Sequence, residues 1–175
     1  QKNEPEWMLL KRLNGLKVFN DKPMPVWGPD ISGLDLDKIH YYMRPNTGQA
    51  DSWDNVPQDI KNTFEKLGIP NAERRFLAGV GAQYESDVIY HNLKKEWEDK
   101  GVVFLNMDDA VKEHPELVKR YFMTNCIPIT LHKFVDLHAS VWSGGPFIYI
   151  PNNFKFDIPL QAYFIMNAKK GVKVE

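Results

Sequence analysis

The residue types most often used in metal binding and catalysis come closest together between residues 132 and 143. His132, Asp136 and His138 have even spacing, so in a β-strand their side chains would point to one face and could ligate a metal ion. At roughly 3.3 Å per residue the two histidines would lie about 20 Å apart. Only Asp136 and His138 could then share an ion, and two protein ligands are too few for a zinc site. We therefore expect partly buried or interface histidines rather than metal ligands.

Two nucleophilic side chains, Cys126 and Ser143, flank this stretch. Cys126 has no basic neighbour in the sequence that would favour the thiolate, so we expect a small buried apolar residue. Ser143 precedes two glycines but lacks the Gly-x-Ser-x-Gly spacing of an esterase, and these residues suit a tight turn. One alternative stays open, in which Asp136, His138 and Ser143 belong to a metal-dependent or hydrolytic enzyme whose other ligands come from distant parts of the fold.

Composition excludes several classes of function. Of the 175 residues, 43% are hydrophobic and 26% are charged, which is typical of a folded globular protein rather than a disordered one. The 22 basic and 23 acidic residues leave a net charge of -1, which disfavours nucleic acid and anionic lipid as partners. A single cysteine excludes an intrachain disulfide and any Cys-rich zinc or iron–sulfur site built by this chain alone.

The sequence has no apolar run of about 18 residues, so it predicts no membrane span. The unpaired cysteine suits a reducing compartment, and we expect a cytoplasmic protein. The first residues contain neither an initiating Met nor a signal peptide, and the last five read as the start of a strand. We therefore expect a piece of a longer protein.

The elements that must position these side chains are mainly helical up to residue 122. Asn3 and Glu6 form a capping-box pattern, which predicts a helix that ends before Gly15. Prolines and glycines over 20–33 predict a loop. Apolar spacing predicts a helix over 57–67. Further helices are expected over 71–78, 91–100, 110–114 and from Pro115, and strands over 83–90 and 102–105.

After residue 123 the pattern becomes rich in β-strand signals. Short apolar runs over 137–142, 147–150, 154–158 and 162–166 are separated by glycine, proline and asparagine. Strands at this spacing fit a sandwich, a barrel or the first coils of a β-solenoid. We predict an α+β fold, with a mostly helical region and a small α/β unit over residues 1–122 and a β-rich region over 123–175.

Seven sequence strings, taken in order, point to one family. The strings are NEPEWM (3–8), FEKLGIP (64–70), LAGVGAQYES (77–86), HPEL (114–117), SVWSGG (140–145), YIP (149–151) and PLQAYF (159–164). Together they resemble the SufB family of iron–sulfur cluster assembly scaffold proteins. Any one string is weak evidence, but seven in the same order over nearly the whole chain make the resemblance specific.

The resemblance implies an N-terminal helical region followed by a right-handed parallel β-helix, of which residues 123–175 would be the truncated first coils. It implies a non-enzymatic scaffold subunit in a cytoplasmic complex with a SufC-type ATPase and a SufD-type paralogue. The related SufD shares the β-helix, but the first and last strings favour SufB. The chain departs from the family pattern at Val135 to His138 and at Ile165.

The resemblance also bears on the site residues. The cysteine and acidic residues that receive sulfur and hold the cluster lie beyond Glu175 in the family, so no catalytic, cofactor or metal residue is assigned within this chain. The iron–sulfur cluster is implied only for the longer protein, and the roles of His132, His138 and Cys126 stay open. A truncated β-helix exposes a strand edge. We therefore expect self-association through residues 137–175.

Overall fold

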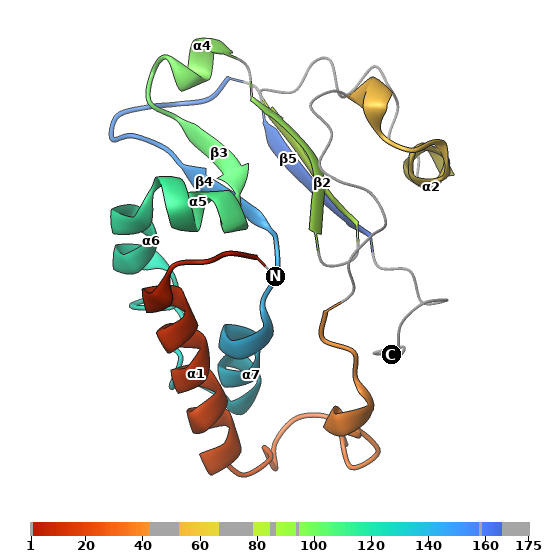
Figure 1. Ribbon diagram of the computed structural model, residues 1–175, viewed down its shortest axis with the longest axis vertical. Helices are drawn as coiled ribbons and strands as arrows, with labels where there is room; N and C mark the ends of the chain where they lie inside the picture. The colour runs from red at the N-terminus through yellow and green to blue at the C-terminus, as the bar shows by residue number, and fades with distance from the viewer. Residues whose placement is uncertain are drawn as a thin grey trace. The chain divides into compact units, whose positions relative to one another are not determined.

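The computed structural model describes residues 2–42, 53–66, 79–84, 87–93, 95–157 and 159–165. These residues form an α+β protein with two compact units (Figure 1). The helical unit contains the described residues of 1–42 and 108–143, and the sheet unit contains those of 53–107 and 144–165. Both units combine segments that are far apart in the sequence, so each one depends on long-range contacts.

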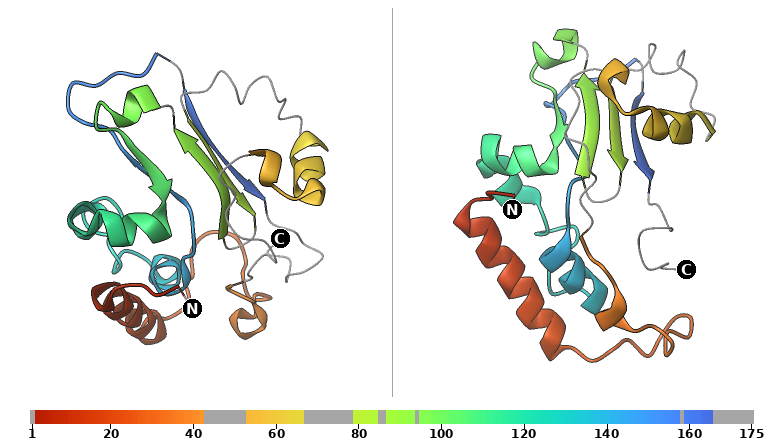
Figure 2. Two further views of the ribbon diagram at one scale, coloured as in Figure 1. Left: turned by 45° about the horizontal axis from the view of Figure 1, so that its top comes forward. Right: turned by 45° about the vertical axis from the view of Figure 1, so that its right-hand side comes forward.

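Two helices form the centre of the helical unit. α1 (Glu6–Asp21) lies alongside α7 (Lys133–Val141), as both views of Figure 2 show. The helices approach closely at Gly15, where a Cβ atom would lie 2.9 Å from Ala139 Cβ. The unit also contains the 3-10 turn η1 (Leu36–Lys38) and two short helices, α5 (Met107–Glu113) and α6 (Pro115–Tyr121). Its core includes Met8, Ala110, Val111, Val118, Ala139 and Trp142.

α1 is longer than the sequence pattern predicts. The predicted cap at Asn3 is wrong, because the helix starts after Pro5 and no side chain caps it. The predicted end before Gly15 is also wrong, because the helix continues to Asp21. Glycine usually weakens a helix interior, but here its missing side chain leaves room for the α7 backbone. Gly15 is therefore a packing residue, and sequence alone reads it as a helix end.

α7 replaces the strand predicted over 137–142, which is wrong. His132 precedes the helix, and its Nδ1 accepts a hydrogen bond from the Phe134 amide at 3.3 Å. Asp136 and Ala139 are buried three residues apart, which is the spacing of one helix face. A short apolar run fits a helix or a strand equally well, and packing against α1 determines that this one is a helix. The β-rich region predicted from residue 123 therefore opens with a helix.

Basic side chains cover the C-terminal ends of three helices in this unit. Lys133 donates to the carbonyl of Phe19 near the end of α1, at 2.6 Å, and Lys11 donates to Phe122 at the end of α6. Arg12 donates a hydrogen bond to the carbonyl of Trp142 at the end of α7. Such carbonyls lack partners within their own helix and carry the negative end of its dipole. The three cations thus join the helices to one another.

The sheet unit contains a three-stranded and a two-stranded sheet. The first has the order β2-β1-β5, from β1 (Gly79–Tyr84), β2 (Asp87–Leu93) and β5 (Leu160–Ile165). β1 pairs with β2 antiparallel and with β5 parallel. The second sheet pairs β3 (Val103–Asn106) with β4 (Pro146–Tyr149) antiparallel. The unit also has the 3-10 turn η2 (Trp53–Asn55) and the helices α2 (Gln58–Lys66) and α4 (Lys95–Glu98).

Aromatic side chains fill the space beside these sheets. Trp97, at 7% exposure, packs with Leu93, Val102 and Phe104. The rings of Phe154 and Phe156 contact Trp97 edge-on at centroid distances of 5.6 and 5.4 Å. The predicted strand over 154–158 is wrong for its described residues 154–157, because these aromatic residues contribute to the core from an irregular segment.

Most of the remaining predictions of helices and strands are confirmed. Three predicted helices are confirmed: α2 for 57–67, α5 for 110–114 and α6 for the helix from Pro115. Three predicted strands are also confirmed: β3 for 102–105, β4 for 147–150 and β5 for 162–166. The strand over 83–90 is instead the end of β1 and the start of β2, and the helix over 91–100 is confirmed only as α4. The helix over 71–78 lies outside the described residues.

Candidate functional site

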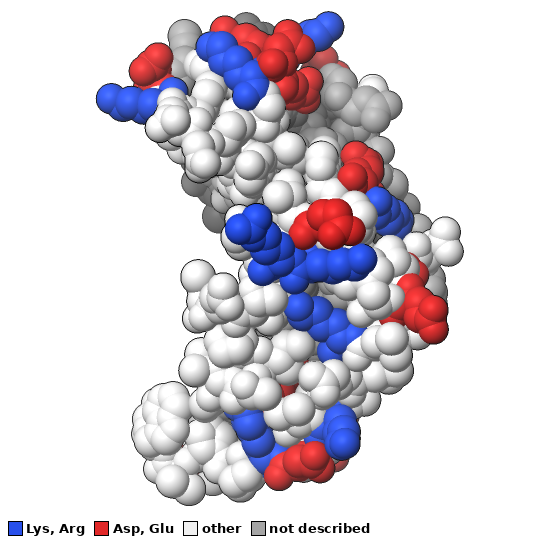
Figure 3. All heavy atoms as spheres, turned by 90° about the vertical axis from the view of Figure 1, so that its left-hand side faces the viewer, with Lys and Arg blue, Asp and Glu red and all other residues white. Residues whose placement is uncertain are grey.

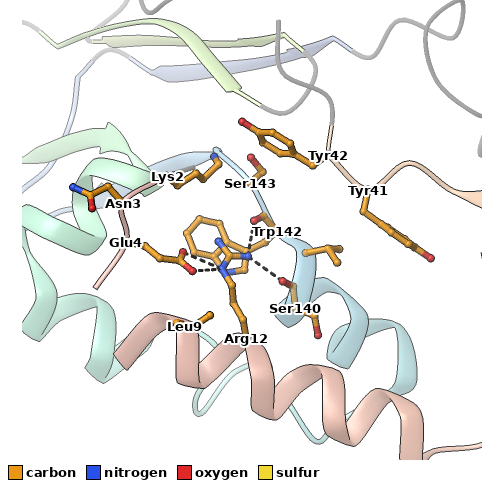
Figure 4. Close-up of a pocket in the computed structure, with 11 residues that line it drawn as sticks. Lys2, Asn3, Glu4, Leu9, Arg12, Tyr41, Tyr42, Ser140, Trp142 and Ser143 are labelled. Carbon is orange, nitrogen blue, oxygen red and sulfur yellow. Dashed lines mark hydrogen bonds and ion pairs between the residues drawn. The ribbon is translucent and has the colours of Figure 1, made fainter. Parts of the chain in front are cut away.

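A pocket of about 500 Å³ opens in the helical unit, between the N-terminal segment and the end of α7. Leu9 and Trp142 form apolar walls, and the rings of Tyr41 and Tyr42 lie on the opposite side from α1 (Figure 4). Tyr41 is held in place because its hydroxyl donates to the carbonyl of Leu36 at 2.8 Å. Burial, followed by the charge of Asp37, raises the pKa of Tyr41. The ring therefore stays neutral at physiological pH.

Arg12 is the central polar group of this pocket. Its Nε lies 2.9 Å from both carboxylate oxygens of Glu4, and Nη1 donates to the carbonyls of Ser140 at 3.1 Å and Trp142 at 2.9 Å (Figure 4). The guanidinium carbon also lies 4.3 Å from the centroid of the Trp142 ring. One side chain thus links the N-terminal segment, α1 and the end of α7. Arg12 cannot be recognised from the local sequence, because its partners Ser140 and Trp142 lie 128 and 130 residues away.

The charges around the pocket are balanced in pairs. Arg12 pairs with Glu4, and Lys2 pairs with Asp108. Lys2 also lies 5.5 Å from the centroid of the Tyr42 ring. A pocket with aromatic walls and compensated charges can hold an apolar or aromatic group, but it gives no excess charge to attract an anion or a cation. Its geometry fits binding rather than acid–base chemistry.

The three residues of the enzyme alternative do not come together around a reacting group. Asp136 and His138 both lie on α7, where residues two apart are separated by about 200° around the helix axis. Asp136 is fully buried, and its Oδ2 lies 2.8 Å from Nζ of Lys22. Ser143 lies in the pocket beyond the end of the helix. The strand-based expectation that Asp136 and His138 share a face is therefore wrong.

The remaining sequence candidates have separate places. His132 caps α7, and its ring lies 5.0 Å from that of Trp27. Cys126 is exposed, so the expected buried position is wrong. Across the described part of the chain, no three His, Cys, Asp or Glu side chains are grouped so that they could hold a metal ion. None of the described helices is long and apolar enough to cross a bilayer.

His138 should titrate below an ordinary histidine. Partial burial, followed by the positive charge of nearby Arg12, lowers its pKa. The folded state therefore binds this proton less readily than the unfolded state, so His138 contributes stability above pH 6.5 that is lost as the pH falls. NMR titration of the imidazole should give a pKa below 6.5, and Arg12→Met should raise it.

The matching stability measurement compares two variants of α7. Replacement of His138 by Gln should make the fall in melting temperature between pH 7 and pH 5 shallower. Ser140→Ala, which changes a partly buried hydroxyl on the same helix and removes no titratable group, should keep the slope of the unchanged protein. An unchanged slope in His138→Gln would contradict the assignment.

Comparison with known proteins identifies the family. Residues 52–162 match the model of the SufBD protein N-terminal region. Over 168 residues the chain is 56% identical to an iron–sulfur cluster assembly SufBD family protein of Staphylococcus saprophyticus, and 55% identical to one of Staphylococcus aureus strain USA300. Each match covers 96% of this chain and 36% of the relative, so the chain spans about a third of the length of these relatives. The chain therefore belongs to the SufBD family, as the sequence resemblance predicted.

Proposed function

We propose that this chain is the N-terminal segment of a SufB-type scaffold subunit for iron–sulfur cluster assembly, and that it is not an enzyme. The observation that carries this proposal is the match over 96% of the chain to relatives named for iron–sulfur cluster assembly. The structure adds a supporting argument, because the charged groups of the pocket are paired, Arg12 with Glu4 and Lys2 with Asp108. The segment would serve folding and docking within a larger assembly.

The fold is consistent with a role at the start of a parallel β-helix. β1 and β5 pair in parallel over six residues each, from Gly79 opposite Leu160 to Tyr84 opposite Ile165. Successive coils of a β-helix pair in this way, so the contact supports our proposal that β-helix coils begin in this region. The division into residues 1–122 and 123–175 is part of the same proposal, although α7 shows that the second part also contains a helix.

The proposed assembly contains a SufC-type ATPase and a SufD-type paralogue and acts in the cytoplasm. We place the ligands of the cluster outside this chain, and we assign no catalytic, cofactor or metal residue within it. Self-association through the C-terminal part would use β5, which lies at one end of the described strand order β2-β1-β5. Residues 137–141 are in α7 and pack against α1, so they cannot supply a strand edge.

Anaerobic reconstitution tests the proposal. Purified residues 1–175 incubated with ferrous iron and sulfide should retain no stoichiometric cluster after desalting, measured by iron and sulfide content and visible absorption. The longer protein, carrying an affinity tag, should retain a cluster and copurify with the SufC-type and SufD-type subunits.

Two outcomes would contradict this proposal. A cluster retained by residues 1–175 and lost in Cys126→Ala would put a ligand inside the segment. A stoichiometric metal ion lost in His138→Ala would support the enzyme alternative instead. Ser140→Ala is the matched control, since it changes a partly buried hydroxyl on the same helix without removing a metal-binding group.

A further inference from the structure

The outer face of α1 is apolar although it faces solvent. Leu9, Leu10, Leu13 and Leu16 are 47%, 58%, 52% and 42% exposed, whereas Met8 and Gly15, on the other side of the helix, are buried. α1 lies on the side of the molecule that Figure 3 shows, where a largely uncharged surface is interrupted by scattered charged groups. Exposed leucines that cluster on one helix face, rather than singly, mark an interaction surface.

Charged residues extend this face in a symmetric order. Glu6, Leu10, Leu13 and Lys17 follow one another at steps of four, three and four residues, so they form one row along the helix. The row is symmetric about the midpoint between residues 11 and 12. A two-fold axis through that point would place Leu10 of one copy on Leu13 of the other, and Glu6 of one copy on Lys17 of the other.

The charges in this row are available for an intermolecular pair. Glu6 and Lys17 are exposed, and within the described part of the chain no ion pair joins either to another residue. They cannot pair within one helix, because eleven residues span about 16 Å. In a parallel arrangement, Glu6 of one copy would face Glu6 of the other, and the two negative charges would repel each other. Only the antiparallel arrangement satisfies both the leucines and the charges.

We propose that α1 is a homodimerisation surface, at which a second copy of this chain packs antiparallel on the row from Glu6 to Lys17. The contact is isologous, since the same patch is used by both copies. Leu9 and Leu16 widen the apolar contact on one side of the row. An interface one helix wide buries less surface area than the interfaces of stable dimers. We therefore expect a reversible dimer with a dissociation constant on the order of 100 μM. This inference does not depend on the proposed function.

Sedimentation velocity of residues 1–175 from 5 to 500 μM tests the proposal. The unchanged chain should shift from monomer to dimer across this range. Leu13→Glu should remain monomeric, because it would bury a carboxylate in the leucine contact. Lys17→Glu should weaken the dimer about fivefold, because it faces Glu6 of the second copy. The double variant Glu6→Lys with Lys17→Glu exchanges both charges and should restore dimerisation.

Two controls separate this surface from others. Val26→Glu makes a similar apolar-to-acidic change at a fully exposed residue outside α1 and should dimerise like the unchanged chain. Phe164→Glu alters β5, the strand through which the C-terminal part would self-associate; Phe164 is 59% exposed, and the variant should leave the dimer through α1 intact. Circular dichroism confirms that each variant is folded.

Three results would overturn the proposal. One is a chain that stays monomeric up to 500 μM. A second is a dimer that Phe164→Glu abolishes and Leu13→Glu leaves intact, which would place the interface at β5. The third is a charge exchange that fails to restore the affinity reduced in Lys17→Glu, which would exclude the antiparallel pairing.

Discussion

Replacement of Lys22 by methionine is expected to lower the free energy of unfolding by about 3 kcal/mol. The carboxylate of Asp136 has 0% exposure, and Nζ of Lys22 lies 2.8 Å from Oδ2. Without that ammonium group the carboxylate is buried with no compensating charge, which costs about 3–5 kcal/mol. Lys22 is itself 29% exposed, so solvent already screens part of the pair and the lower end of the range applies.

Urea denaturation of a matched set of variants measures this effect. Lys112→Met removes an exposed lysine from α5 and should change the free energy of unfolding by less than about 0.5 kcal/mol. The double variant Lys22→Met with Asp136→Asn removes both charges and should be more stable than Lys22→Met alone. If Lys22→Met were as stable as the unchanged protein, Lys22 would contribute little to stabilising the buried carboxylate of Asp136.

Replacement of Gly15 by alanine is expected to lower the free energy of unfolding by about 1 kcal/mol, although alanine favours a helix. The added Cβ would lie 2.9 Å from Ala139 Cβ and 3.0 Å from the backbone oxygen of Asp136. Contacts this short force α1 and α7 apart, and overpacking of this kind costs about 1–3 kcal/mol. The gain in helix propensity, about 1 kcal/mol, offsets only part of this cost.

The neighbouring residue provides the control for this prediction. Asn14→Ala makes a change to alanine on the exposed side of the same helix turn, and it should be neutral or slightly stabilising. Adding Ala139→Gly to Gly15→Ala removes one of the two clashing carbons and should recover part of the loss. If Gly15→Ala were as stable as Asn14→Ala, the close approach of α1 and α7 would not limit this position.

The predictable parts of the fold are those where local pattern and packing agree. α2 has apolar residues at helical spacing, with Ile60 and Phe64 buried, and β3 is a short apolar run after a glycine. Gly15 and the run over 137–142 were misread because their local patterns conflict with their packing. In both cases the contact between α1 and α7 overrides the local preference.

The candidate site was less predictable than the fold. Its central group, Arg12, binds carbonyls of residues 140 and 142 and the carboxylate of Glu4. No spacing rule relates these positions, because side-chain partners across a helix–helix contact depend on how the helices pack. The sequence candidates Asp136 and His138 were close in the chain, but the helix directs them to opposite sides.

By itself, the sequence determined the family and the α+β class, because both follow from ordered motifs and local patterns along the chain. Only the tertiary structure decided that residues 133–141 form a helix, that Lys22 balances the buried Asp136, and that the leucines of α1 remain exposed. The helix and the ion pair depend on contacts between segments more than a hundred residues apart, and the leucines stay exposed because α1 packs on α7 through its other face. Local sequence does not show such contacts.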